Sequence, residues 1–362
     1  MTLHWPEWMR INENLKNLTP YGAPQIDVPY RLNTNENPYS LRPELQRAII
    51  DAISVKVSHL NRYPDRDAIE LRSALANFIN MRSGTSFDVS NIWAANGSNE
   101  ILQSIALAFQ GDAMGFEPSY SMHPLISRAV GKKWISIPRA ADFLIDLDKA
   151  LQAISVQKPG IVFITTPNNP TGGSTPLAAI EKIAAAAKGV NALVVVDEAY
   201  AEFSSQPSAV TMIKDSPNII VSRTMSKAFA FAGARLGYMI ADPSVIDAML
   251  LIRLPYHLSD LTQAAATAAL SHQDLLLSDV KRISESRESL ISELQQLGFT
   301  VIPSDANFIL FTGFKSEAAQ VWNSLVEAGV LIRDVGIPNY LRVTVGAESE
   351  NRALIDALRK VI

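Results

Sequence analysis

Short apolar runs alternate with longer amphipathic stretches between about residue 91 and about residue 255. The apolar runs are Ile92–Ala95, Ile161–Thr165, Leu193–Val196 and Ile219–Val221. Continuous runs of this kind are typical of strands that a parallel sheet buries on both faces. The amphipathic stretches between them predict covering helices. We therefore expect an α/β fold with a mostly parallel central sheet flanked by helices.

Helical periodicity predicts several helices before this region and within it. They span Pro43–Val57, about 67–80, Ile101–Phe109 and Leu177–Ala187. Thr175 is expected to cap the last of these helices, with Pro176 in its first turn. Because polar loops follow the predicted strands, we expect those loops to gather at the carboxyl edge of the sheet, where open α/β sheets bind ligands.

The pattern changes after about Pro255. Helical stretches at about 260–271, 274–297 and 316–328 alternate with strand-like runs at 299–302, 308–311, 330–333 and 340–345, and a final helix follows. Gly298 and Gly329 are expected to stop the helices that precede them. These features predict a smaller α/β domain at the C-terminus.

The changes of pattern divide the chain into four predicted parts. Residues 1–30 contain proline, asparagine and tyrosine and are expected to form an arm. Residues 31–60 are expected to pack with the small domain, residues 61–255 to form the large domain, and residues 256–362 to form the small one. We find no internal repeat and no low-complexity segment.

Composition narrows the class of protein. The 362 residues are 48% hydrophobic and 19% charged, which is typical of an ordered globular protein. The net charge of −4 argues against a nucleic-acid-binding surface. The absence of cysteine excludes disulfides and thiolate metal sites. The start of the chain lacks a signal-peptide pattern and no apolar run is long enough to span a membrane, so we expect a cytoplasmic protein.

One lysine is the strongest candidate for chemistry. Lys227 follows the run that ends at Val221, lies next to Thr224 and Ser226, and precedes Arg235 by eight residues. Its amine could condense with an aldehyde if burial or a neighbouring cation lowers its pKa. Arg235 and the two hydroxyls could hold a phosphate. Pyridoxal phosphate is an aldehyde that carries a phosphate, so it would suit both the amine and the phosphate-binding groups. The alternative is that Lys227 is a surface lysine beside an unrelated glycine pair.

Asp197 and two possible hydrogen-bond donors follow neighbouring strands. Asp197 ends an apolar strand, and a buried acid there needs a cationic partner such as a protonated pyridine nitrogen. Asn169 and Tyr200 could both donate to the phenolate oxygen of the same ring. The alternatives are a helix-capping aspartate and a plain Asn-Pro turn.

Two further motifs fit an aromatic phosphate ester. Gly97, Ser98 and Asn99 open a helix directly after a strand, which is a favourable place for a phosphate. This is not a dinucleotide-binding motif, because it lacks Gly-x-Gly-x-x-Gly. Tyr120 could stack on the ring, although a core tyrosine is an equal alternative.

Two arginines interrupt apolar strands of the small domain. Arg342 has no acid beside it, so a buried anionic ligand is the preferred partner. Arg333 could bind the same anion or pair with Asp334. The histidines show no metal-ligand spacing and are given no chemical role; they are His4, His59, His123, His257 and His272.

With these residues assembled, the chain resembles the fold-type I, aspartate-aminotransferase-like, pyridoxal-phosphate-dependent aminotransferases. The motifs occur in order along nearly the whole chain: LTPYGAPQ, RLNTNENPY, LNRYPDRDA, AANGSNEIL, PSYSMHP, TTPNNPTGG, VVDEAYAEF, SRTMSKAFAFAGARLGY, LIRDVG and LRVTVG. Within this family the NRYP segment and the LTPY arm are most similar to the histidinol-phosphate aminotransferases.

The resemblance implies a role for each candidate residue. Lys227 would bind the cofactor covalently and then carry a proton between the substrate Cα and C4′ of the cofactor. Asp197 would bind the pyridine nitrogen, with Tyr200 as a further catalytic residue. The remaining implied cofactor ligands in the large domain are Ser98, Asn99, Tyr120, Asn169, Thr224, Ser226 and Arg235. Many relatives carry an acidic residue where Asn99 stands. If backbone N–H groups bind the phosphate here, the side chain at this position matters little.

The resemblance also implies substrates and partners. Tyr63 would reach the cofactor of a neighbouring subunit, which makes the enzyme a homodimer with shared sites. The implied substrate-binding residues are Tyr21, Asn37, Arg333 and Arg342. The implied reaction exchanges an amino group between L-histidinol phosphate and 2-oxoglutarate, giving imidazole acetol phosphate and L-glutamate, in histidine biosynthesis. No nucleic acid, membrane or metal partner is implied.

Three other functions are possible for these residues. An aromatic amino-acid aminotransferase would share the whole cofactor site, and a phosphate-recognising decarboxylase could use the same scaffold. A cofactor-binding regulator would carry an added DNA-binding domain, for which this chain lacks both the length and the basic charge.

Overall fold

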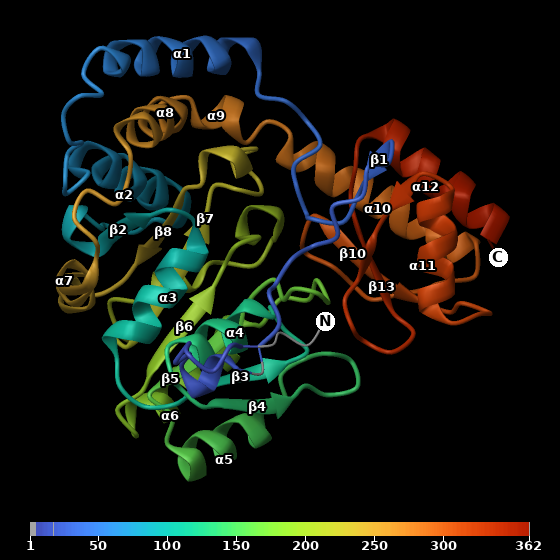
Figure 1. The fold of residues 1–362 in the computed structure, drawn as a ribbon, viewed down its shortest axis with the longest axis horizontal. Coiled ribbons are helices and arrows are strands. Elements are labelled where there is room, and N and C mark those ends of the chain that lie inside the picture. Colours follow the sequence, from blue (N-terminus) through green and yellow to red (C-terminus); the bar gives the residue numbers. More distant parts are fainter. Residues whose placement is uncertain (1–4, 17, 362) are drawn as a thin grey trace.

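The computed structural model describes residues 5–16 and 18–361. Residues 1–4 and 17 of the predicted arm lie outside the described residues. A seven-stranded sheet forms the centre of the large domain, with the strand order β2-β8-β7-β6-β5-β3-β4 (Figure 1). The strands are β2 (Ile92–Ala95), β3 (Ala113–Glu117), β4 (Trp134–Pro138), β5 (Ile161–Thr165), β6 (Leu193–Asp197), β7 (Ile219–Thr224) and β8 (Gly237–Ile240). All neighbouring pairs are parallel except those made by β8, which is antiparallel to β2 and to β7.

Helices cover both faces of this sheet. They are α2 (Ile69–Ser83), α3 (Ser98–Ala108), α4 (Met122–Ala129), α5 (Leu147–Gln157), α6 (Leu177–Lys188) and α7 (Pro243–Ile252). Alternate residues of each strand point to opposite faces. Phe163 and Val195 therefore pack in the core formed with α3, α4 and α7, whereas Val162 and Val194 pack in the core formed with α2, α5 and α6. Burial of both faces explains the continuous apolar runs, and the predicted fold class is confirmed.

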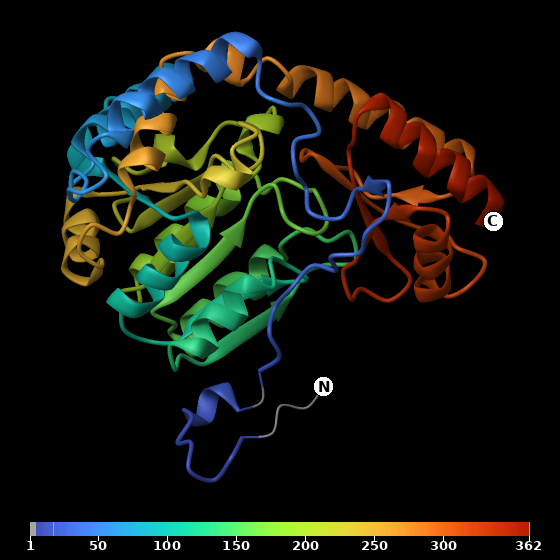
Figure 2. The ribbon, with the colours of Figure 1, turned by 45° about the horizontal axis from the view of Figure 1, so that its top comes forward.

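The C-terminal region forms a second sheet beside the first (Figure 2). Its strand order is β12-β13-β10-β9, with β9 (Thr300–Val301), β10 (Phe308–Thr312), β12 (Arg333–Asp334) and β13 (Leu341–Thr344). The helices of this region are α10 (Val280–Gln296), α11 (Ala318–Glu327) and α12 (Glu348–Val361). The neighbouring strands in this sheet are antiparallel.

The segment after the arm runs from one domain to the other. A short strand, β1 (Tyr30–Arg31), pairs with β11 (Val330–Leu331) in the small domain. The chain then enters α1 (Pro43–Val57), which lies along α8 (Asp260–Leu270) (Figure 1). The arm itself contains a 3₁₀ turn at Glu13–Leu15, which lies against α4. The domain boundaries remain predictions. In the part of the chain that the structure describes, no helix could cross a membrane.

Two expectations about helices are wrong. The helix predicted over 274–297 is two helices, α9 (Gln273–Leu276) and α10, because Ser278 bonds back to Leu275 and the turn is held by Arg42, which donates to Ser278 and pairs with Asp279. Thr175 does not cap α6. The capping position is Pro176, and the amide of Thr175 donates instead to the Thr166 hydroxyl.

Candidate active site

A cavity of about 430 Å³ lies at the carboxyl ends of β5, β6 and β7. Its volume lies in the range of small-molecule sites, and its position is where open α/β sheets bind ligands. Residues from the arm, the large sheet and the small domain all reach it. Thirteen of the fifteen candidate residues line it: Tyr21, Ser98, Asn99, Tyr120, Asn169, Asp197, Tyr200, Thr224, Ser226, Lys227, Arg235, Arg333 and Arg342.

Lys227 lies in the loop that connects β7 to β8. Its Nζ donates to the carbonyl oxygen of Thr34, 2.9 Å away. Removal from water, with smaller contributions from Arg342 and Arg235, lowers the pKa of this amine to about 8. The unprotonated share of this amine near neutral pH is therefore much larger than in an ordinary lysine, which favours a role as nucleophile.

Asp197 ends β6 and is buried. Its Oδ2 lies 3.2 Å from Nε2 of His123, which is also buried and stacks on Phe163. Its Oδ1 is buried and has no hydrogen-bond partner among the described residues. A buried carboxylate with one oxygen unpaired calls for a cationic donor, and a protonated pyridine nitrogen fits that requirement.

The start of α3 lies close to Arg235 at the cavity. Gly97 precedes this helix with a φ of +84°, and a Cβ added there would lie 2.7 Å from Nη2 of Arg235. A Cβ on Gly237 would lie 2.3 Å from the amide nitrogen of Ser98. The two glycines thus let Arg235 and the helix N-terminus approach one another. Such a cradle fits a phosphate, because both components attract an anion.

Two hydroxyls complete the cradle. Thr224 Oγ1 donates to Ser226 Oγ at 3.0 Å, and Nη1 of Arg235 donates to the same Ser226 oxygen at 3.4 Å. The arginine itself has a positive φ of 55°, which turns its side chain back toward the start of the loop. The chain therefore brings together all the phosphate-binding candidates of the lysine loop.

Tyr200 is held by two asparagines. Its hydroxyl accepts from Nδ2 of Asn35 at 2.9 Å and from Nδ2 of Asn169 at 3.4 Å. Burial raises the pKa of this phenol to about 12, so the hydroxyl keeps its proton and can donate it as a hydrogen bond. Asn35 was not a candidate from the sequence, although it lies in the motif RLNTNENPY.

Tyr120 also lines the cavity. Its hydroxyl donates to Oδ1 of Asn99 at 3.1 Å, and burial raises its pKa. Its ring meets the ring of His123 edge-on, with centroids 5.4 Å apart. The tyrosine therefore belongs to the same aromatic group that supports Asp197.

Arg342 is a buried cation without a carboxylate partner among the described residues. Its Nη1 donates to Oδ1 of Asn169 at 2.6 Å and its Nη2 to the carbonyl oxygen of Asn33 at 2.8 Å. Its Nε is buried with no partner. Burial lowers the pKa of this guanidinium to about 10. A buried guanidinium without a carboxylate partner favours the binding of an anionic ligand.

Arg333 lies directly opposite Arg342 in the register of β12 and β13. Its guanidinium is 6.0 Å from the ring of Tyr21 in the arm. The alternative pairing with Asp334 is absent, since Arg333 has no carboxylate within ion-pair distance in the residues the structure describes. Two arginines thus face one end of the cavity, with the arm tyrosine beside them.

Two candidates do not line the cavity of this chain. Tyr63 is 80% exposed and stacks on Tyr256, with ring centroids 4.4 Å apart. Asn37 donates to the carbonyl oxygen of Ala228 at 3.1 Å and accepts from the amide of Tyr39. Asn37 therefore braces the residue that follows Lys227 instead of facing the cavity.

Comparison with known proteins identifies relatives of the whole chain. The family model described as "Aminotransferase class I and II" matches residues 29–358. The histidinol-phosphate aminotransferase of Mycolicibacterium smegmatis is 52% identical over 351 residues, which cover 96% of this chain and 92% of that protein.

Solved structures have the same fold. The histidinol-phosphate aminotransferase of Sinorhizobium meliloti, solved in complex with pyridoxal-5′-phosphate, has a TM-score of 0.82 at 27% identity, covering 97% of each chain. An aspartate aminotransferase variant from Thermus thermophilus has a TM-score of 0.83 at 21% identity, covering 98% of this chain and 100% of that one. At that identity the second likeness concerns the fold alone.

Proposed function

We infer the function of this chain from its family, since the chain belongs to the class I and II aminotransferases. It uses pyridoxal phosphate as cofactor. It transfers an amino group between L-histidinol phosphate and 2-oxoglutarate, in the biosynthesis of histidine. Identity of about 51% to histidinol-phosphate aminotransferases over nearly the whole chain supports this substrate pair.

One observation carries the assignment of the site. A single cavity gathers Lys227, the half-satisfied carboxylate of Asp197 and the unpaired cation of Arg342. This reaction needs three groups of this kind: an amine nucleophile, a partner for the ring nitrogen of the cofactor and a partner for an anionic substrate.

The large domain would hold the cofactor. Pyridoxal phosphate supplies an aldehyde that accepts the amino group and a ring that withdraws electrons from the substrate Cα. Asp197 would keep the ring nitrogen protonated, while Asn169 and Tyr200 donate to the ring oxygen. The phosphate would be bound by Ser98, Asn99, Thr224, Ser226 and Arg235, with Tyr120 against the ring.

Lys227 would have two tasks. It would hold the cofactor and, as a free amine, would carry a proton between the substrate Cα and C4′ of the cofactor. The pKa of about 8 suits both tasks, because a base that titrates near the working pH gives and takes a proton with little cost.

The small domain and the arm would recognise the substrate. L-Histidinol phosphate carries a phosphate and no carboxylate, whereas L-glutamate carries a side-chain carboxylate. Arg342 and Arg333 can bind either anion through charge-assisted hydrogen bonds, and the exposed Tyr21 lies on the arm, which can adjust to the difference.

The proposal includes a homodimer in the cytoplasm. Tyr63 stands on the surface of its own subunit, which suits a residue that enters the site of a second copy. Because L-histidinol phosphate and 2-oxoglutarate are charged, they cannot cross a bilayer unaided, and this favours the compartment in which they are made.

A half-reaction screen tests the substrate assignment. L-Glutamate first converts the bound cofactor to its aminated form. The enzyme is then offered imidazole acetol phosphate or one of a panel of oxo acids, and the return of the cofactor to its aldehyde form is followed by absorbance. We expect imidazole acetol phosphate to react fastest. A clear preference for phenylpyruvate would make the protein an aromatic aminotransferase, and release of carbon dioxide without an amino acceptor would make it a decarboxylase. Lys227→Ala should abolish both the absorbance band and turnover.

A further inference from the structure

The loop that carries Tyr63 is held by several polar contacts, and Tyr63 itself stacks on Tyr256. Tyr63 is 80% exposed and Leu60 is 55% exposed, and the loop ends at Ala68, whose φ of +47° is unusual for a residue with a side chain. A strained backbone persists only where its surroundings hold it. The contacts that hold this loop therefore decide where Tyr63 points.

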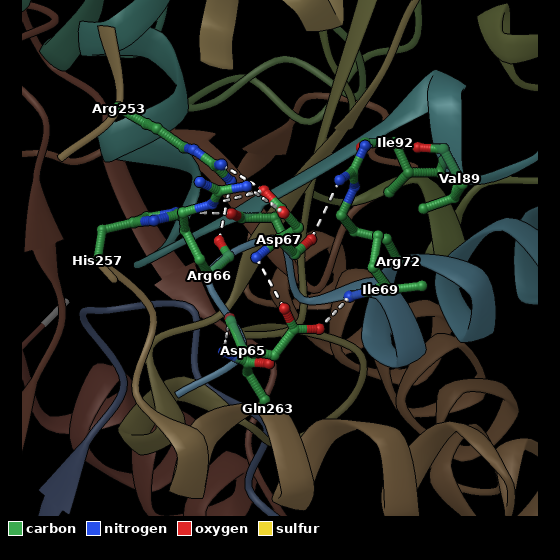
Figure 3. A network of polar contacts seen from close by, with 11 residues as sticks. Asp65, Arg66, Asp67, Ile69, Arg72, Val89, Ile92, Arg253, His257 and Gln263 are labelled. Atoms are coloured by element: carbon green, nitrogen blue, oxygen red, sulfur yellow. Dashed lines mark hydrogen bonds and ion pairs between the residues drawn. The ribbon is translucent and has the colours of Figure 1, made fainter. Parts of the chain in front are cut away.

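The first contact fixes the loop to the helix that follows. Asp65 accepts from the amides of Asp67 and Ile69 at the start of α2 (Figure 3). Arg72, one turn into the helix and buried, donates to the carbonyl oxygen of Asp67 at 3.1 Å and to that of Ile92 at 2.7 Å. The loop is thereby joined to the first strand of the central sheet.

The second contact comes from the segment between α7 and α8. Arg253, with a side chain only 9% exposed, pairs with Asp67 and donates to the carbonyl oxygen of Arg66 at 2.9 Å (Figure 3). Hydrogen bonds from Arg66 and Arg253 lower the pKa of Asp67 to about 2, so this carboxylate stays charged throughout the physiological range. Arg253 thus grips two consecutive residues of the loop.

The segment that carries Arg253 is itself firmly anchored. Asn96 donates to the carbonyl oxygen of His257 at 2.9 Å, and the imidazole of His257 lies 3.0 Å from the carbonyl oxygen of Ala94. Gln263 donates to the carbonyl oxygen of Asp65 at 3.0 Å. The support of the loop therefore rests on the sheet edge and on α8 of the same subunit.

We propose that Arg253 is a positioning residue that holds Tyr63 in place for the active site of a second copy of this chain. The inference rests on the proposed function, in which Tyr63 binds the cofactor of the partner subunit. Arg253 touches neither cofactor nor substrate in this role. It acts by fixing the loop before association, so that the phenol enters the partner's site without a cost of ordering.

The proposal makes Arg253 act across the interface, and two mixed dimers test this. In the first, one chain carries Arg253→Met and Lys227→Ala, and the other chain is unchanged. In the second, one chain carries Lys227→Ala and the other carries Arg253→Met. Both dimers contain the same two substitutions, so general loss of stability cancels. Each has one Lys227 site, and only in the first does that site receive Tyr63 from a chain without Arg253.

Release of the cofactor from the Lys227 site is measured by the decay of its absorbance after dilution. We expect release to be about tenfold faster in the first dimer than in the second. With Arg253→Lys in place of Arg253→Met the difference between the two dimers should become smaller, since lysine keeps a positive charge beside Asp67 but loses the forked contact. Arg42→Met, which removes the Arg42–Asp279 ion pair and none of the contacts named for this loop, is the control and should leave both rates equal.

Two outcomes would overturn the inference. Equal release from both mixed dimers would show that Arg253 does not act through the partner's site. Tyr63→Phe is placed in the same two arrangements to separate this failure from that of the shared site. If Tyr63→Phe speeds release only across the interface and Arg253→Met does not, the positioning role alone is wrong; if Tyr63→Phe has no such effect, the shared site and the inference both fall.

Discussion

The imidazole of His123 lies 3.2 Å from the carboxylate of Asp197, and both side chains are buried. The contact uses one carboxylate oxygen of Asp197, a residue that lines the cavity, and leaves the other oxygen buried without a partner among the described residues. The histidine can therefore orient the acid without competing for the ligand.

Replacing His123 by phenylalanine tests this support. His123→Phe keeps a ring that can stack on Phe163 but removes the hydrogen bond to Asp197. We expect kcat to fall about tenfold to a hundredfold, with a smaller change in KM, because the carboxylate would hold the ring nitrogen less firmly. Steady-state kinetics measure the effect. His272→Phe, at an exposed position, is the control and should behave as wild type.

The amine of Lys227 should set the pH dependence of cofactor capture. Its pKa of about 8 means that the reactive, unprotonated form grows as the pH rises through 8 and then levels off. Stopped-flow absorbance of cofactor-free protein mixed with pyridoxal phosphate should show this midpoint. Arg342→Met should move the midpoint upward, since Arg342 helps to lower the pKa, whereas Arg333→Met should not. A midpoint that stays near 10.5 would contradict the assignment.

The same pKa predicts how the stability of the cofactor-free protein depends on pH. The folded value of about 8 lies below the reference value of 10.5, so between these values the unfolded chain binds more protons at this lysine. The contribution of Lys227 to the free energy of unfolding therefore rises with pH across this window. Urea denaturation of wild type and of Lys227→Met should show that the difference in their free energies of unfolding shifts in favour of the wild type as the pH rises from 8 to 10.5.

Gly97 should be indispensable for the phosphate cradle. In Gly97→Ala the new Cβ would lie 2.7 Å from Arg235, which must then move away from the helix N-terminus. We expect the dissociation constant of the cofactor to rise about tenfold or more. Gly84→Ala is a matched control, because Gly84 also has a positive φ but open space around it. Both variants should lose about 1 kcal/mol of stability, and only Gly97→Ala should lose affinity, as fluorescence titration would show.

Arg342 should matter for both substrates of the exchange. Arg342→Met removes the buried cation, and loss of a charge-assisted contact is worth about 1.5–3 kcal/mol. The value of kcat/KM should therefore fall about tenfold to a hundredfold for L-glutamate and for L-histidinol phosphate alike. If only apolar amino acids were affected, Arg342 would not be the anion-binding residue.

Local patterns were enough to predict much of the fold. The helix over Pro43–Val57 has proline at its first position and a clear apolar stripe, and it was predicted with its observed bounds. The buried strands β5 and β6 are almost wholly apolar runs, and β7 begins with the predicted run Ile219–Val221 but continues through the buried polar residues Ser222–Thr224. By contrast, β3 contains Gly115, β4 ends in Pro138, and β8 begins within the lysine motif, so none of these three shows an isolated β-branched run.

The supporting residues of the site could not be found in the same way. The lysine, the acid and the arginines follow or interrupt strands, and that position is visible in the sequence. His123 and Asp197 are separated by 74 residues, and Asn35 and Tyr200 by 165. Which side chain meets which over such distances is decided by tertiary packing, and a histidine without ligand spacing gives no local sign of its partner.

The antiparallel direction of β8 keeps Lys227 and Arg235 in one loop. Because β8 runs back beside β7, one loop leaves and re-enters the same sheet edge, and its base is closed by a bond from Met225 to Leu236. Lys227 and Arg235 therefore lie in one loop that is closed at its base. If β8 were parallel to β7, a long crossover connection would separate the two residues. The position of Lys227 relative to Arg235 is therefore set within this one loop and does not depend on the arm or on the small domain.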